Sequence, residues 1–306
     1  MRSPLFEVVP NFSEGRDEAK IERIVAAVRA VEGVRVLGLH SDPDHNRSVL
    51  TFAGEEDAVL QAAVALAEAC ASEIDLASQT GEHPRMGSLD VLPFVPLDGA
   101  TLEDAARLAR LAGEKIGPLG FAVYLYETAA TALHRRNLAD VRRGGYEGLT
   151  ARMGNPLWRP DYGPSELDPR KGAVAVGARP FLVAFNAYLD TDDVSVARAI
   201  ARTVRERDGG LAGVKALGLE VGGRAQVSMN LKNLEKTPIP VALEAVRSAA
   251  AEHGASVEST ELVGLAPLEA ILQVARHYLR LQELDREHVL EVALWDTQQD
   301  RHGRAC

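Results

Sequence analysis

The spacing of hydrophobic residues in the first half of the chain predicts strands and helices in alternation. Ile21, Ile24 and Val28 lie three or four residues apart, on one face of a helix over about 17–31. The same spacing predicts helices over about 55–77 and 101–115. Short apolar runs predict strands at 5–9, 34–39, 48–52, 91–96 and 121–125. The predicted order is therefore β-α-β-β-α-β, followed by one more helix and strand.

The same order recurs in the second half of the chain. Apolar runs predict strands at 181–186, 214–219, 225–231 and 257–262, the middle two joined as a hairpin at Gly222-Gly223. Helices are predicted over about 192–206, 238–253 and 267–282, and in the tail beyond 284. The repetition predicts an α/β (α+β) protein of two similar βαββαβ-type subdomains, residues 1–178 and 179–306, in which helices cover an antiparallel or mixed sheet.

The segment from about 128 to 178 has no such pattern and is rich in Arg, Gly and Pro. We expect it to be irregular, with short helices near 138–143 and 146–152 and a long loop over 158–165. A loop of this length in a compact protein is more often a binding loop than a simple connection.

Composition excludes several classes of protein. The chain of 306 residues is 46% hydrophobic and 25% charged, which is ordinary for a globular protein, and its net charge is −10 with only 5% aromatic residues. Without a basic block it is not expected to bind nucleic acid. Cys70 and Cys306 form no CxxC pair, so neither a zinc site nor a disulfide is indicated. We see no signal peptide and no membrane-spanning run, and we expect a cytoplasmic enzyme or binding protein.

A loop from Gly81 to Asp90 places an imidazole, a guanidinium and two carboxylates within ten residues. It contains His83 and Arg85 between Glu82 and Asp90, and Pro84 favours an extended backbone at the histidine. An imidazole titrates near neutral pH and can accept and return a proton. The loop is therefore either the site of a catalytic histidine or a turn that leads into the next strand.

Other kinds of site fit the sequence less well. His40, Asp42, Asp44 and His45 form a cluster of metal-ligand types, but their spacing matches no metal motif, so solvated turn residues are the better interpretation and no metal is expected. The glycines at 218–223 lack the Lys and Ser/Thr of a phosphate-binding loop, and a hairpin explains them.

Polar residues interrupt the apolar strands of the second half. Gln226, Ser228 and Asn230 alternate with apolar residues and so share one face of the sheet, and Asn186 lies in the first strand of that half. This face either contacts solvent or binds a flat polar ligand.

Several long motifs together resemble the glutamate formimidoyltransferase (formiminotransferase) family. They are Val9-Pro10-Asn11-Phe12-Ser13-Glu14-Gly15, Asn46-Arg47-Ser48-Val49, the whole Gly81–Asp90 loop, Pro160-Asp161-Tyr162-Gly163-Pro164, Gly177-Ala178-Arg179, the strand 181–186, Gln226-Val227-Ser228-Met229-Asn230-Leu231, and Glu261 to Leu268. The resemblance covers nearly the whole chain. It matches the transferase part alone, so we expect the cyclodeaminase domain of the animal enzyme to be absent.

The resemblance implies transfer of a formimino group from N-formimino-L-glutamate to N5 of tetrahydrofolate, as in histidine degradation and one-carbon metabolism. It implies that His83 is the catalytic residue and that folate binds along a segment from Gly163 through Pro164 and Ser165 to Gly172. It also implies two subdomains whose sheets face one another across a ligand tunnel, and a homodimer. Tetrahydrofolate then serves as co-substrate, with no metal.

Proximity in sequence suggests further roles at this site. Either Arg85 or Arg47 would bind a substrate carboxylate, either Asp42 or Asp90 would support the imidazole, and Asn46 would offer a hydrogen-bond donor. Transfer of a formyl group from N-formyl-L-glutamate to the same acceptor, and folate binding without catalysis, are the alternatives. A pure scaffold fits the long polar loops poorly.

Overall fold

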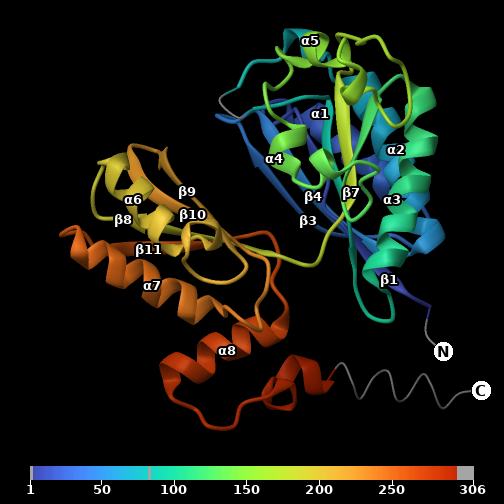
Figure 1. Ribbon diagram of the computed structural model, residues 1–306. Coiled ribbons are helices and arrows are strands. Elements are labelled where there is room, and N and C mark those ends of the chain that lie inside the picture. The colour runs from blue at the N-terminus through green and yellow to red at the C-terminus, as the bar shows by residue number, and fades with distance from the viewer. Residues whose placement is uncertain (1–2, 82–83, 295–306) are drawn as a thin grey trace, which may run out of the picture. The chain divides into compact units, whose positions relative to one another are not determined.

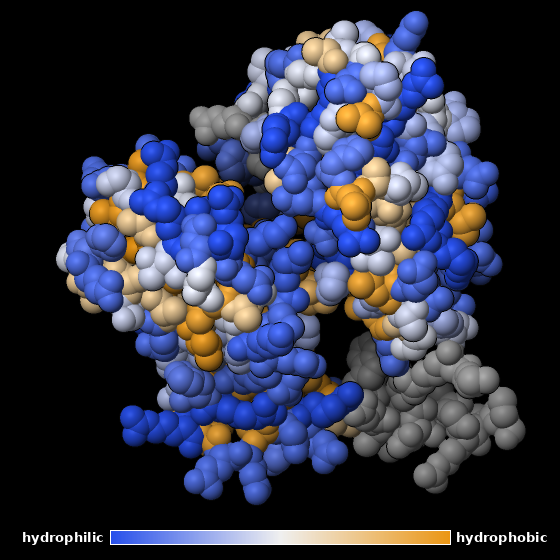
Figure 2. All heavy atoms as spheres, in the orientation of Figure 1, coloured by the Kyte–Doolittle hydropathy of each residue, from blue (hydrophilic) through white to orange (hydrophobic). Residues whose placement is uncertain are grey.

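The computed structural model describes residues 3–81 and 84–294, which fall into two compact units with the boundary between Phe181 and Leu182. Each unit has its own sheet and its own helices (Figure 1). The order of strands and helices in each unit is the βαββαβ order that the hydrophobic pattern predicts, with additions in the first unit. Hydrophilic residues predominate on the face seen in Figure 2, and apolar side chains form only small separate groups there.

The first unit is built on a seven-stranded sheet. Its strands are β1 (Leu5–Val8), β2 (Asn11–Phe12), β3 (Arg35–Asp42), β4 (Arg47–Glu55), β5 (Leu89–Pro96), β6 (Ala122–Glu127) and β7 (Ala173–Ala178). The strands β1 and β2 both pair with β4 and with β5, so they form one interrupted strand between these two neighbours. The interruption falls at Pro10, which has no amide hydrogen to donate to a neighbouring strand. Pairing is antiparallel except for β5–β7 and β6–β7, which are parallel.

Three amphipathic helices pack on one face of this sheet: α1 (Glu18–Arg29), α2 (Glu56–Glu73) and α3 (Leu102–Ile116). Their apolar faces, such as Ile24 and Leu66, share one core with Phe52 and Phe94 of the strands. Each such side chain contributes about 1.5–3 kcal/mol by leaving water. Cys70 lies in this core as a buried thiol, and burial raises its pKa.

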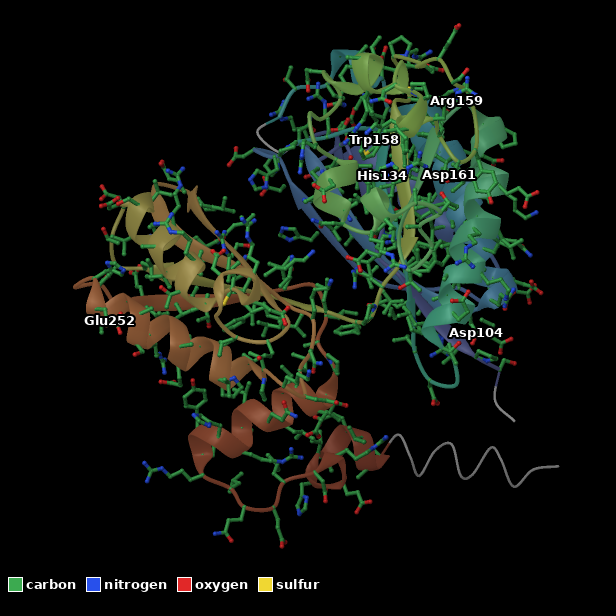
Figure 3. The ribbon with its side chains drawn as sticks, in the orientation of Figure 1. Asp104, His134, Trp158, Arg159, Asp161 and Glu252 are labelled. Atoms are coloured by element: carbon green, nitrogen blue, oxygen red, sulfur yellow. The ribbon has the colours of Figure 1, made fainter. Side chains whose placement is uncertain are left out.

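Two short helices, α4 (Leu138–Val141) and α5 (Leu149–Met153), belong to a second core together with Tyr124 and Tyr126 of β6. In this region a buried ion pair joins Arg135 to Asp161, and Trp158 packs edge-on against Tyr124. Figure 3 shows Asp161, Trp158 and His134 gathered in this part of the unit. The segment predicted to be irregular therefore has an ordered interior of its own.

The second unit is a four-stranded antiparallel sheet in the order β11-β8-β10-β9. Its strands are β8 (Val183–Leu189), β9 (Val214–Val221), β10 (Arg224–Leu231) and β11 (Val257–Val263), and its helices are α6 (Val194–Val204), α7 (Ile239–Glu252) and α8 (Leu268–Leu279). In the first unit the corresponding strands lie in the same spatial order, β5-β1/β2-β4-β3: the fourth strand of the βαββαβ order lies next to the first, then come the third and the second. The predicted similarity of the two halves is thus confirmed at the level of strand order.

Three local predictions were wrong. The strand β7 lies within 128–178, where no strand was expected, because its sequence is mostly small residues with weak strand preference. The polar connection expected from His40 is shorter, since β3 continues to Asp42. The short strand β2 lies between the strand predicted at 5–9 and the helix predicted from 17, where no strand was expected, because Asn11 and Phe12 pair with β4 and β5. No helix in the described part of the chain is long and apolar enough to cross a membrane.

Candidate functional site

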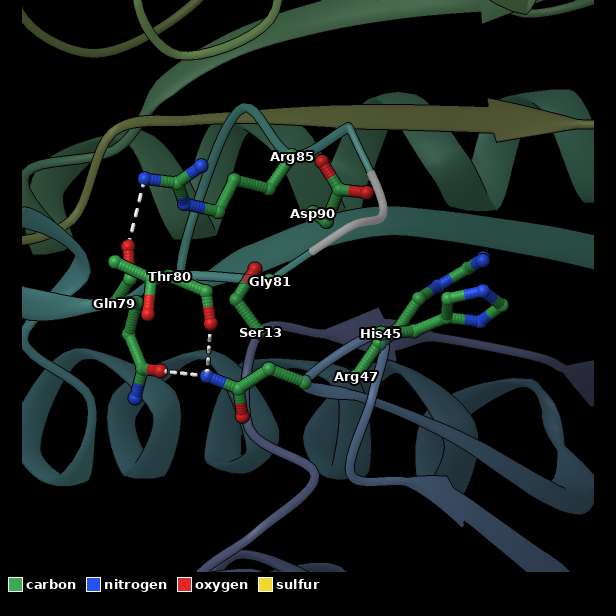
Figure 4. A pocket seen from close by; sticks show the side chains of 9 residues that line it. Ser13, His45, Arg47, Gln79, Thr80, Gly81, Arg85 and Asp90 are labelled. Atoms are coloured by element: carbon green, nitrogen blue, oxygen red, sulfur yellow. Dashed lines mark hydrogen bonds between the residues drawn. The ribbon is translucent and has the colours of Figure 1, made fainter. Parts of the chain in front are cut away.

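A small pocket in the first unit brings together side chains from four separate segments of the chain (Figure 4). The space between its walls is about 250 Å³ when open solvent is included. Its lining consists of Ser13, His45, Asn46, Arg47, Gln79, Thr80, Gly81, Arg85 and Asp90. Four of the residues predicted for the site, Asn46, Arg47, Arg85 and Asp90, are therefore neighbours in space.

The turn between β3 and β4 is held by hydrogen bonds of two side chains. Asp42 Oδ1 accepts the amides of Asp44 and His45, each at 2.9 Å. Asn46 is buried and has a left-handed backbone with φ of 49°, which asparagine tolerates better than most residues. Its Oδ1 accepts the amide of Gly15 at 2.9 Å, and its Nδ2 donates to the carbonyl of Thr80 at 3.0 Å. Asn46 thus links three segments and fixes the start of β4.

Arg47 follows directly and supplies a half-buried positive charge. Its Nη2 donates to Asn11 Oδ1. Burial lowers the pKa of Arg47 to about 10, although the carboxylates of Asp90 and Asp42 act in the opposite direction. The guanidinium remains charged at neutral pH, and its partial desolvation strengthens its attraction for an anion.

Arg85 is the second cation of the pocket. Its Nη2 donates to the carbonyl of Gln79 at 2.8 Å, and its Nη1 lies 3.2 Å from Glu147 Oε1. Its guanidinium also lies 5.4 Å from the centre of the Tyr146 ring. The side chain of Glu147 is 69% exposed, so its ion pair with Arg85 contributes little and is easily exchanged for a ligand carboxylate.

Asp90 is almost fully buried, with 1% of its surface exposed. Its Oδ1 accepts the amide of Met86 at 2.8 Å, and its Oδ2 lies 2.6 Å from Arg142 Nη2. The same nitrogen of Arg142 donates to the carbonyl of Pro84. Both carboxylate oxygens of Asp90 therefore have hydrogen-bond partners within the protein. That Asp90 supports the imidazole of His83 stays a prediction.

Several polar residues in or beside the pocket were not predicted as site residues from the sequence, among them Ser13, Gln79 and Arg142. Ser13 Oγ donates to the carbonyl of Gly87 at 2.8 Å, and Gln79 Nε2 donates to the buried Glu14 at 3.1 Å. The motif that contains Ser13 and Glu14 was available as a signal, because it belongs to the family resemblance. Gln79 and Arg142 belong to no recognisable motif, so no signal in the sequence distinguishes them.

The two ends of the predicted folate segment lie in different places in the first unit. Gly163 and Pro164 line a different pocket, formed with the end of α3 and Tyr162. Gly172 has a φ of 72° and pairs with Gly87 in an isolated bridge, so close that a Cβ atom there would lie 2.3 Å from the carbonyl oxygen of Met86. Its requirement for glycine is thus explained by packing against the loop.

The polar row of the second unit lies on one face of its sheet, as the alternation predicts. Ser228 is paired with Asn186 across β10 and β8, and Asn186 is paired with Glu261 of β11. The amide of Asn186 donates to Glu261 Oε2 at 3.1 Å. Along this row Gln226 is buried and Asn230 is exposed, so the two interpretations, solvent contact and ligand binding, both stay open.

His83 and Glu82 lie outside the described residues, and the structure therefore does not place the predicted catalytic imidazole. Within residues 3–81 and 84–294, no three His, Cys, Asp or Glu side chains are grouped so that they could hold a metal ion. His45 Nδ1 lies 3.1 Å from Asp42 Oδ2, which gives this histidine a partner in its own turn.

Comparison with known proteins identifies relatives along almost the entire chain. The formiminotransferase domain, N-terminal subdomain, matches residues 5–179, and the formiminotransferase domain matches residues 184–294. Glutamate formimidoyltransferase of Streptococcus pyogenes serotype M1 is 40% identical over 291 residues, which is 94% of this chain and 97% of that protein. The protein of the same name from Thermoplasma acidophilum is 44% identical over 292 residues, covering 94% and 96%. Formimidoyltransferase-cyclodeaminase of Sus scrofa is 40% identical over 92% of this chain and 54% of its own length.

Proposed function

The chain belongs to the formiminotransferase family, and on this premise we propose that it transfers the formimino group of N-formimino-L-glutamate to N5 of tetrahydrofolate and releases L-glutamate. The observation that carries this proposal is the identity of 40% and 44% to two glutamate formimidoyltransferases, each over 94% of the chain. Tetrahydrofolate is then a co-substrate, and the reaction is a one-carbon transfer that belongs to histidine degradation.

The charge of the pocket supports a dicarboxylate donor. N-formimino-L-glutamate has two carboxylates at neutral pH, and Arg47 and Arg85 are both among the residues that line the pocket. A guanidinium binds a carboxylate through two parallel hydrogen bonds, which fixes orientation as well as charge. We assign one or both arginines to this contact, with Asn46 as a rigid support of the turn that carries Arg47.

The reaction requires a group that moves one proton. When N5 of tetrahydrofolate attacks the formimino carbon, a C–N bond forms and N5 becomes an ammonium in a tetrahedral intermediate. Neutral His83 accepts that N5 proton and returns it to the glutamate nitrogen, whose bond to carbon then breaks. Such general acid–base catalysis typically contributes about 10²–10⁴-fold, and holding both substrates in register contributes up to roughly 7–11 kcal/mol of barrier reduction.

Each unit, considered by itself, offers one candidate region for the folate: the segment of Gly163, Pro164, Ser165 and Gly172 in the first unit, and the polar row of the second unit. In that row, Asn186, Gln226, Ser228 and Asn230 offer amide and hydroxyl groups that suit the hydrogen-bonding edge of a pterin. The family resemblance further implies a cytoplasmic homodimer, which sedimentation equilibrium of the purified chain would measure.

Turnover by the purified protein tests the proposal. We expect glutamate release in equal amount to the consumption of tetrahydrofolate when N-formimino-L-glutamate is the donor, with a product of the mass of 5-formiminotetrahydrofolate. N-formyl-L-glutamate in the same assay decides between formimino and formyl transfer. Binding of tetrahydrofolate without glutamate release from either donor, by protein with a folded circular dichroism spectrum, would contradict the proposal and identify a folate-binding protein.

A further inference from the structure

Arg142 contacts the pocket loop from a distant part of the chain. It follows directly after α4, 52 residues beyond Asp90. Its Nη2 lies 2.6 Å from Asp90 Oδ2 and also donates to the carbonyl of Pro84. Asp90 in turn accepts the amide of Met86 at 2.8 Å through its other oxygen. The ion pair therefore contacts the loop backbone at two points.

These two points lie on either side of Arg85, the pocket arginine. Pro84 precedes it and Met86 follows it, and the carbonyl of Arg85 itself accepts the amide of Tyr146 at 2.6 Å. The backbone of the three consecutive residues 84–86 is thus hydrogen-bonded to Arg142, Tyr146 and Asp90, which lie outside these three residues. His83 is the residue immediately before Pro84 in the sequence.

The ion pair is sheltered, which distinguishes it from the surface pairs of this protein. The side chain of Asp90 is 2% exposed and that of Arg142 is 19% exposed. Charges withdrawn from water are screened little, so a pair of this kind keeps a fixed geometry where an exposed pair does not. Arg143, the next residue, pairs with Asp140 and has 77% of its side chain exposed.

We propose that Arg142 is a positioning residue of the transferase, which acts with Asp90 to fix the backbone from Pro84 to Met86 and so presents Arg85 to the substrates. The proposal rests on the proposed function for the identity of the reaction. It gives Asp90 a role in holding the loop rather than in supporting the imidazole. Loss of the guanidinium leaves Asp90 without its ion-pair partner and the carbonyl of Pro84 without this donor.

The test compares Arg142→Ala with the matched control Arg143→Ala. For Arg142→Ala we expect kcat/KM to fall about 100-fold, the effect associated with a displacement of about 1 Å in an active site. Free guanidinium ion added to Arg142→Ala is expected to restore part of the lost activity, which a general loss of stability would not allow. For Arg143→Ala we expect activity within about twofold of wild type, because an exposed ion pair contributes little.

Hydrogen exchange of the Met86 amide reports whether Asp90 and Arg142 hold the loop backbone, and it does not depend on catalysis. In Arg142→Ala this amide is expected to exchange faster than in wild type, and in Arg143→Ala at the wild-type rate. A folded Arg142→Ala protein with unchanged activity and unchanged Met86 exchange overturns the proposal. Lost activity with unchanged exchange also overturns it, because Arg142 would then act on the substrate itself.

Two further variants keep the test decisive. If Arg142→Ala does not fold, Arg142→Lys and Asp90→Asn are measured in its place. In each of them we expect faster Met86 exchange together with reduced kcat/KM, and wild-type values of both would overturn the proposal. If the wild-type protein itself shows no turnover, the proposed function fails, while the exchange measurement still decides whether Arg142 fixes the loop.

Discussion

Asp161 should be the most costly single carboxylate to remove from the first unit. Its Oδ2 accepts from Arg135 Nη1 at 2.6 Å and from the amide of Leu125 at 2.7 Å, and its Oδ1 accepts from Thr131 Oγ1. The two side chains of the ion pair are only 6% and 9% exposed. Asp161→Ala therefore leaves the amide of Leu125 without this acceptor and the buried guanidinium of Arg135 without its counter-charge, with only the carbonyls of Leu157 and Arg159 as acceptors.

The expected magnitude follows from this burial. Removal of one partner of a buried ion pair costs about 3–5 kcal/mol, because the remaining charge stays desolvated. The lost acceptor of the Leu125 amide is part of the same network, so its cost is not added separately. The total free energy of unfolding of a protein is about 5–15 kcal/mol. Asp161→Ala should therefore leave the first unit only slightly more stable than its unfolded state, or unfolded.

Urea unfolding followed by the fluorescence of Trp158 measures the loss. Arg152 lies 3.8 Å above the ring of Trp158, so this signal reports the segment in question, and a Trp295→Phe background removes the other tryptophan. The control is Glu22→Ala, whose exposed pair with Arg29 should contribute about 0–1 kcal/mol. The reasoning is refuted if Asp161→Ala lowers the free energy of unfolding no more than this control does.

Three other predictions concern the remaining features of the fold and site. Gly163→Ala should be far more destabilising in urea than Gly209→Ala: both glycines have positive φ, but only at Gly163 would a Cβ meet a backbone oxygen, that of Phe121, at 2.0 Å. Burial raises the pKa of Glu7, so the stability that its protonated carboxyl contributes is present below about pH 4.5 and is lost as pH rises. Glu7→Gln should therefore gain stability relative to wild type between about pH 4 and pH 7. A difference in the free energy of unfolding between the two proteins that does not change with pH would contradict this. Arg47→Lys should raise the KM for N-formimino-L-glutamate about tenfold, the value of one charge-assisted hydrogen bond, and the wild-type KM should itself rise as pH passes about 10.

Much of the fold was predictable because the hydrophobic period of each element is local information. The amphipathic spacing of Ile21, Ile24 and Val28 predicts α1 correctly, and the turn at Gly222-Gly223 predicts the β9–β10 hairpin. Strand β7 was not predictable in this way. It lies between β5 and β6 in parallel pairing and is buried on both faces. Its sequence Ala-Val-Ala-Val-Gly-Ala therefore shows no alternation of polar and apolar residues, and it contains no apolar residue larger than valine.

The candidate site was predictable where its residues are close in sequence. Asn46 and Arg47 lie in one turn, and Arg85 and Asp90 lie in one loop, so each pair is recognisable as a group from the amino-acid sequence alone. Arg142 was not, because its contact with Asp90 depends on how α4 packs against the sheet. A long-range ion pair of this kind leaves no pattern in a single sequence.

The rate of formimino transfer by His83→Ala, measured beside wild type with saturating tetrahydrofolate and N-formimino-L-glutamate, tests the account most directly. Loss of a general base predicts a kcat lower by about 10²–10⁴-fold, in a variant that still binds both substrates. A kcat within about tenfold of wild type would contradict the assignment of the proton transfer to this histidine.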